Sequence, residues 1–157
     1  MTDKRLVVKV DSTLKGRNAA FACYIKPYFS GARGKSFPGA YYSGSMPAMD
    51  SIHCEMLGIV LAIEHANTFA DITRINKADT TLQVRNDCLI AINSLELSRE
   101  RPANSRIGRR LLAAMNKWPG PIELTKVSRS DLKTVHLLCN RTNNQMIETR
   151  REWECDG

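Results

Sequence analysis

The chain has 157 residues, of which 43% are hydrophobic, and its formal net charge at pH 7 is +7. This length fits a single globular domain (residues 1–157) that needs neither disulfides nor a structural metal to fold. A signal-peptide core and apolar stretches of transmembrane length are both absent, so we expect a soluble, cytoplasmic protein that does not contact a membrane. The five cysteines include no C-x-x-C pair, which indicates reduced thiols.

The basic charge balance favours a polyanionic partner. The isoelectric point is about 9.4, and lysines or arginines that neutralise phosphates gain free energy from counterion release. Charge alone does not name that partner, and the sequence leaves the oligomeric state open. One group of basic residues surrounds a predicted helix near residue 110, where the alternative is an ordinary solvated helix face: Arg106, Arg109, Arg110 and Lys117.

The first half of the chain predicts a meander followed by a helix. We expect strands over residues 6–10 and 19–25, joined through a turn at Gly16 and therefore antiparallel. Prolines and glycines in the segment 26–39 predict a loop that leads to a third strand around residues 40–42.

A long helix follows this meander. Asp50 or Ser51 is suited to cap it, and its apolar residues continue to about Phe69. The helix is apolar almost all round, which predicts burial on more than one side. An alternating segment at 80–84 then predicts a fourth strand.

Two more helices come next. We expect Asn86 or Asp87 to cap the second helix, and Pro102 and Asn104 to open the third. The third helix has one apolar stripe and stops at the Pro-Gly-Pro segment 119–121.

The chain should end with a fifth strand over 122–127 and a polar helix over 140–153. The resulting order is βββαβααβα. Because a parallel strand pair needs a crossover helix, this order predicts an α/β fold in which a five-stranded mixed sheet carries helices on both faces.

Three acidic residues each border or interrupt a strongly apolar segment: Asp11, Glu55 and Asp87. A carboxylate near a core is costly unless it is hydrogen-bonded, paired or bound to a cation, so the three together indicate a metal site, most simply for Mg²⁺. The separate explanations are a turn residue for Asp11, a first-turn charge for Glu55 and a plain N-cap for Asp87. One shared site accounts for all three more simply than three independent accidents.

With this element order, the motifs resemble the type 1 ribonuclease H family, a branch of the retroviral-integrase-like nuclease fold. The segment Asp11-Ser12-Thr13 resembles the family's first-strand Asp motif. The segment 55–64 is similar to its first-helix Glu followed by an apolar run, and Asn86-Asp87-Cys88 resembles the Asp that ends the fourth strand. The order and spacing of all three agree with the family.

The chain departs from the family at the fourth acid. The family has an Asp in the last helix, four residues after an Asn, and here Asn144 takes that place after Asn140. An amide oxygen can still ligate Mg²⁺, but it carries no charge and should weaken a second metal position. His136, expected in the loop before the last helix, is similar in position to a mobile family histidine that assists product release.

The resemblance implies a metal-dependent endonuclease that hydrolyses the RNA strand of RNA/DNA hybrids with two Mg²⁺ ions, or with Mn²⁺. The implied metal ligands are Asp11, Glu55, Asp87 and Asn144, with His136 as a further catalytic residue. We expect Ser12, Thr13 and Ser51 to donate to phosphate or 2′-hydroxyl groups, and the basic group near residue 110 to hold the nucleic acid. The alternatives are a DNA nuclease of the same fold, such as a junction resolvase, and a nucleic-acid-binding module whose catalysis has decayed.

Overall fold

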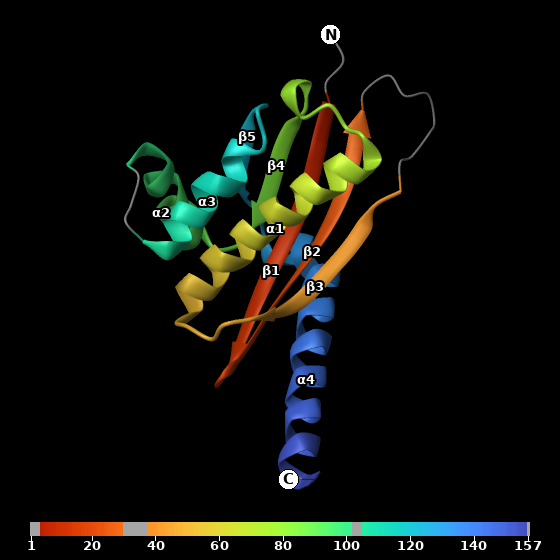
Figure 1. Cartoon of the computed structure of the whole chain (residues 1–157), viewed down its shortest axis with the longest axis vertical. Helices are drawn as coiled ribbons and strands as arrows, with labels where there is room; N and C mark the ends of the chain where they lie inside the picture. Colours follow the sequence, from red (N-terminus) through yellow and green to blue (C-terminus); the bar gives the residue numbers. More distant parts are fainter. Residues whose placement is uncertain (1–3, 30–37, 102–104, 157) are drawn as a thin grey trace.

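A five-stranded mixed sheet forms the centre of the structure (Figure 1). The computed structural model of the chain describes residues 4–29, 38–101 and 105–156, and side chains up to residue 149. The sheet has the order β3-β2-β1-β4-β5, in which β1 pairs antiparallel with β2 and parallel with β4. The strands are β1 (Lys4–Lys15), β2 (Asn18–Phe29), β3 (Ala40–Met46), β4 (Thr81–Asn86) and β5 (Ile122–Lys126). The predicted fold class is therefore confirmed.

Helices cover both faces of the sheet (Figure 1). One face carries α1 (Ser51–Thr73), α2 (Leu89–Glu100) and α3 (Arg106–Asn116). The other carries α4 (Lys133–Asp156), which projects past the end of the sheet. Short 3-10 turns, η1 (Lys77–Asp79) and η2 (Arg129–Leu132), precede β4 and α4. Among the described helices, none is both long and apolar enough to cross a membrane.

The first two strands are longer than predicted. β1 continues beyond residue 10 to Lys15, and Gly16 turns the chain at a φ of 59°, a left-handed conformation that glycine adopts without strain. Asp11 therefore lies inside a paired strand, opposite Ala22, and is not a turn residue. β2 likewise continues through residues 26–29, where a loop was expected, while 30–37 lie outside the described residues.

The helix starts show which predicted caps hold. The side chain of Asp50 accepts a hydrogen bond from the His53 N–H at 2.9 Å, which confirms the predicted cap of α1. At α2 the prediction was wrong, because Cys88 is the N-cap and its N–H donates to the Asn86 side chain at 2.8 Å. Ser105 caps α3, and the residues proposed to open that helix, 102 and 104, lie outside the described residues.

The last helix starts seven residues earlier than predicted, at Lys133 instead of 140. Val135 and Cys139 of its first turns are buried against Ala20 and Ala22 of β2. Tertiary packing of these small and apolar side chains outweighs the low helix propensity of the local Thr-Val pair. His136 therefore belongs to the first turn of α4 and not to a loop.

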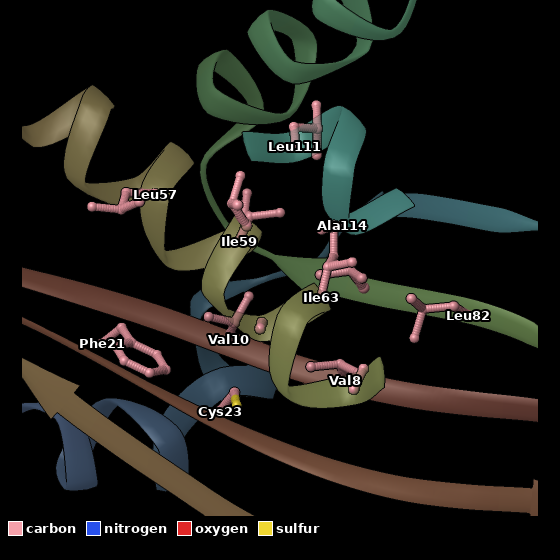
Figure 2. Packing of buried hydrophobic residues seen from close by; sticks show 14 of the residues in the cluster. Val8, Val10, Phe21, Cys23, Leu57, Ile59, Ile63, Leu82, Leu111 and Ala114 are labelled. Carbon is pink, nitrogen blue, oxygen red and sulfur yellow. The ribbon is translucent and has the colours of Figure 1, made fainter. Parts of the chain in front are cut away.

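The main core lies between the sheet and α1. Figure 2 shows Ile59 and Ile63 of α1 between the strands, which contribute Val8 and Val10, and α3, which contributes Leu111. All five side chains are fully buried. This agrees with the prediction that α1 is buried on more than one side.

We predict that Gly120→Ala destabilises the protein by about 2 kcal/mol or more, the range typical of overpacked sites. A Cβ at Gly120 would lie 2.2 Å from the Lys77 carbonyl oxygen and 2.6 Å from that of Thr80. Both are backbone atoms, and the Thr80 carbonyl also accepts a hydrogen bond from the Trp118 indole at 3.1 Å, so neither can move cheaply. Urea denaturation measures the effect. Gly16→Asn is the control, since an added Cβ there meets nothing within 4 Å and Asn tolerates positive φ. Equal stability of the Gly120→Ala and wild-type proteins would contradict this packing.

Candidate metal centre

The three predicted acids meet at the carboxyl end of β4. One carboxylate oxygen from each of Asp11, Glu55 and Asp87 lies within 4.8 Å of the other two. The parallel pairing of β1 with β4 ends at Lys9 and Arg85, so the two aspartates follow just after the paired region. Glu55 enters from the first turns of α1. Three segments distant in sequence thus deliver one carboxylate each to the same point.

Asn86, the last residue of β4, joins two of these segments. Its side-chain amide donates to the Val10 carbonyl at 3.0 Å and to Glu55 Oε2 at 3.1 Å. Its own oxygen accepts from the Cys88 N–H at the start of α2. The buried side chain therefore fixes β1, α1 and α2 around the acids, a role that the sequence did not indicate.

Asp11 is the most deeply buried acid, with 5% of its surface exposed. Its Oδ1 accepts a hydrogen bond from the Ser12 N–H at 2.9 Å, and its Oδ2 lies 2.6 Å from His136 Nδ1. Burial raises the pKa of the Asp11 carboxyl, the negative charge of Asp87 adds to this, and the bonds from His136 and Ser12 oppose it.

The pKa of Glu55 is shifted more strongly than that of Asp11. Burial raises the pKa of Glu55 to about 8, and repulsion from Asp11 and Asp87 adds to the shift, while the bond from Asn86 and the charge of Arg129 oppose it. At neutral pH the cluster therefore retains a proton that a bound dication would displace.

Arg129 is a site residue that sequence reasoning missed. Its Nε lies 3.7 Å from Asp87 Oδ2, and its side chain is 86% exposed. It belongs to η2, 42 positions after Asp87, and nothing in its local sequence marks it. Only the tertiary fold brings this cation to the acids.

The acids border an open pocket of about 310 Å³. Ser51 and Arg129 line its rim, and Ser12 lies within its wall. The Ser12 hydroxyl oxygen is buried and has no hydrogen-bond partner among the described residues. Gly58 closes over it, since a Cβ there would lie 2.1 Å from Ser12 Oγ. Three convergent carboxylates, two of them with raised pKa values, fit a divalent cation with oxygen ligands.

His136 lies in this pocket, on the first turn of α4. Its Nε2 is 3.0 Å from the Asn140 side-chain nitrogen, one helical turn further on. The expected mobile loop position is therefore corrected: the imidazole is held between Asp11 and Asn140 at the wall of the site.

The structure does not bring Asn144 to the acids. It is exposed, and its Oδ1 accepts a hydrogen bond from Lys15 Nζ at 3.0 Å. Asn144 follows His136 by eight residues, or about 12 Å along the helix axis. The expectation that Asn144 completes the metal site is corrected accordingly. Thr13 also lies outside the pocket lining, where its hydroxyl accepts from the Asn143 side chain at 3.0 Å.

The basic group on α3 is exposed but does not line the pocket. Arg106 and Arg109 project from the first turn of α3. Arg110 makes two hydrogen bonds to Glu64 of α1, at 2.6 and 2.8 Å, and these raise its pKa. Lys117 is exposed after the end of the helix and, through its carbonyl, accepts a hydrogen bond from Lys77. A molecule bound in the pocket would therefore contact these basic residues only if it also extended beyond the pocket lining.

No family model and no curated protein sequence matches the chain. Solved structures do. RNase H1 from the halophilic archaeon Halobacterium salinarum is 17% identical, with a TM-score of 0.62 over 90% of this chain and 98% of that one. The N-terminal RNase H domain of a Mycobacterium tuberculosis protein is 12% identical, with a TM-score of 0.64 over 93% of this chain and 98% of that domain. LC11-RNase H1, solved in complex with an RNA/DNA hybrid, is 11% identical, with a TM-score of 0.60 over 90% of this chain and 99% of that one. The resemblance read from the motifs is thus confirmed in three dimensions, and the chain has the ribonuclease H fold.

Proposed function

We propose that the protein is a metal-dependent endonuclease that hydrolyses the RNA strand of RNA/DNA hybrids. The observation that carries the proposal is the convergence of Asp11, Glu55 and Asp87 within 4.8 Å at the wall of an open pocket. Three hard oxygen ligands beside an open pocket suit a metal-dependent reaction on a phosphate group. The solved complex of LC11-RNase H1 with an RNA/DNA hybrid supports the choice of substrate.

The three acids would hold two Mg²⁺ ions, or Mn²⁺ in their place. Bound dications of this kind activate a water molecule and neutralise the charge that develops on the phosphate and on the leaving oxygen. The chain itself fixes the ligands: Asn86 orients Glu55, and the Ser12 N–H together with His136 orients Asp11. Arg129 keeps one charge beside Asp87 and extends into solvent, where its guanidinium is placed to contact a phosphate oxygen.

Substrate contacts follow from exposure. Ser51 is exposed and lines the pocket, so it is free to donate to a phosphate or a 2′-hydroxyl, whereas the Ser12 hydroxyl is buried beneath Gly58 and we expect a smaller contribution from it. Arg106, Arg109 and Lys117 are exposed cations that suit backbone binding away from the scissile bond, in a protein of net charge +7. Thr13 and Arg110 are already engaged by Asn143 and Glu64, so we expect smaller contributions from them.

A second function is favoured by one specific observation. Asp11 is already hydrogen-bonded to His136, and Asp87 faces the positive charge of Arg129, so both carboxylates have partners without a metal. A nucleic-acid-binding module with decayed catalysis would show this arrangement.

Cleavage of a labelled RNA/DNA hybrid separates these functions. The assay compares the hybrid with duplex RNA, duplex DNA and a four-way DNA junction, in Mg²⁺, Mn²⁺ or EDTA. We expect metal-dependent cutting of the RNA strand of the hybrid alone. Junction cutting would identify a DNA nuclease of the same fold, and binding of the hybrid without cutting in any ion would identify the decayed module.

We further propose that residues 1–157 act as one domain in the cytoplasm. A single sheet organises all described elements, and the four cysteines in the described side chains are free thiols, as a reducing compartment favours. Mass spectrometry of the purified chain after alkylation without reductant should find Cys23, Cys54, Cys88 and Cys139 unpaired.

A further inference from the structure

Helix α4 brings an imidazole, and not a carboxylate, to the acids. His136 lies in its first turn, lines the pocket of Asp11, Glu55 and Asp87, and places Nδ1 2.6 Å from Asp11 Oδ2. Of the α4 side chains described, up to residue 149, the only acidic one is Glu148. Glu148 lies about 18 Å further along the helix axis. α4 therefore has a nitrogen donor at the place where it reaches the site.

Asn140 fixes the orientation of this imidazole. An amide NH₂ group only donates hydrogen bonds, so at 3.0 Å it makes His136 Nε2 the acceptor. The ring proton then lies on Nδ1 and is donated to Asp11 Oδ2. Both ring nitrogens have partners, and the ring, which is part-buried, is held facing the acids.

From this geometry we propose that His136 is a nitrogen ligand of the metal centre, and that it makes the centre prefer transition-metal dications such as Co²⁺ and Mn²⁺ over Mg²⁺. The inference rests on the proposed function only in that the three acids bind a divalent cation. It replaces the fourth oxygen ligand expected from Asn144, which is exposed and bound to Lys15.

Ligation requires a shift of the ring proton. Nδ1 loses its proton to water, Nε2 gains one from water, and the ring remains neutral. Asn140 can follow this change, because rotation of its amide presents Oδ1 as the acceptor for the new Nε2–H. A histidine ligand whose other nitrogen donates to a side-chain oxygen is the arrangement that usually orients and strengthens such ligands.

The metal preference follows from the donor set. Imidazole nitrogen binds later first-row dications more tightly than earlier ones, whereas Mg²⁺ favours a rigid shell of oxygen ligands. One nitrogen among three carboxylates therefore shifts selectivity toward Co²⁺ and Mn²⁺ without removing the charge that any dication needs. Replacing the nitrogen with an oxygen should shift it back.

Pulsed electron paramagnetic resonance of Mn²⁺ bound to the full chain, with no nucleic acid present, tests the ligand directly. We expect nitrogen hyperfine coupling from a coordinated imidazole in the wild-type protein, and loss of that coupling in His136→Asp. Titration calorimetry should show the ratio of Co²⁺ to Mg²⁺ affinity fall at least about tenfold in His136→Asp, the scale of a ligand-shell change. His53→Asn is the matched control, because this histidine of α1 is exposed and outside the pocket lining, and the coupling should survive there.

The outcomes keep the inference separate from the proposed function. Mn²⁺ binding without nitrogen coupling, or coupling that persists in His136→Asp, would overturn the ligand assignment even if the protein cleaves hybrids. Nitrogen coupling in a protein that cuts no hybrid would support the ligand and overturn the nuclease. Circular dichroism checks the fold of His136→Asp, and His136→Gln, a neutral side chain of similar size, serves as a second variant that must also lose the coupling.

Discussion

Asp87→Asn should lower the rate of Mg²⁺-dependent hybrid cleavage at least about 100-fold, equivalent to about 2.7 kcal/mol of transition-state stabilisation. The variant removes one of three carboxylates within 4.8 Å of each other and keeps the shape of the side chain. Asp11→Asn should have the same effect, since Asp11 lies at the centre of the hydrogen bonds from Ser12 and His136. The loss should come from metal binding and not from folding.

Single-turnover cleavage at saturating protein measures this effect, with circular dichroism as the check on folding. Asp79→Asn is the matched control, because Asp79 is exposed in η1 at the opposite end of β4 and pairs with Lys4 at 3.1 Å. That variant should cleave at the wild-type rate. Cleavage by Asp87→Asn within about threefold of wild type, less than 1 kcal/mol, would remove Asp87 from the metal centre.

The acids could be predicted because their signal is local. Each follows or opens an apolar segment, and the parallel pairing of β1 with β4, which ends at Lys9 and Arg85, brings Asp11 and Asp87 to the same place. The predicted end of β1 was wrong by five residues, but this error did not matter. The position of Asp11 depends on where β4 ends and not on where β1 ends.

The contribution of α4 could not be predicted in the same way. Its buried stripe, Val135, Cys139 and Asn143, has helical spacing that continues back to Leu132 of η2, and this spacing was a signal available in the sequence. A helix predicted to start at residue 140 leaves out Val135 and Cys139, so this spacing is not recognised. The comparison with the family motif then assigns the fourth ligand to Asn144. Successive helix residues are about 100° apart, so Asn144 points to solvent when Asn143 is buried. His136, in the first turn of the helix, is the α4 residue that contacts Asp11.

Arg129 shows a different limit. An exposed arginine in a short 3-10 turn looks like any other surface cation. Its role depends on a contact with Asp87 that the placement of η2 beside β1 creates. Asn86 is similar, because its three hydrogen bonds join segments that the sequence separates. Positions that support a site are set by tertiary contacts more than by local pattern.

Glu55→Gln should stabilise the metal-free protein and flatten the dependence of its stability on pH. The pKa of Glu55 is raised from its ordinary 4.5 to about 8, chiefly by burial, with repulsion from Asp11 and Asp87 adding to it. Between these two values the folded protein holds a proton that the unfolded chain has lost. In the wild-type protein, the free energy of unfolding that depends on protonated Glu55 is therefore fully present below about pH 4.5 and is lost as the pH rises to about 8.

Urea denaturation in EDTA at a series of pH values from 5 to 9 measures this difference. Gln is neutral throughout and can keep the hydrogen bond from Asn86, so the stability of the variant relative to wild type should grow with pH and level off near pH 8, reaching roughly 2 kcal/mol or more. Saturating Mn²⁺ should narrow this difference, since a dication at 100 times its Kd stabilises the wild type by about 2.7 kcal/mol and the variant less. Glu123→Gln, an exposed position on β5, is the control and should follow the wild-type profile. Parallel profiles for wild type and Glu55→Gln would mean that Glu55 is ionised in the metal-free protein, and that the three acids do not repel one another strongly enough to require a cation.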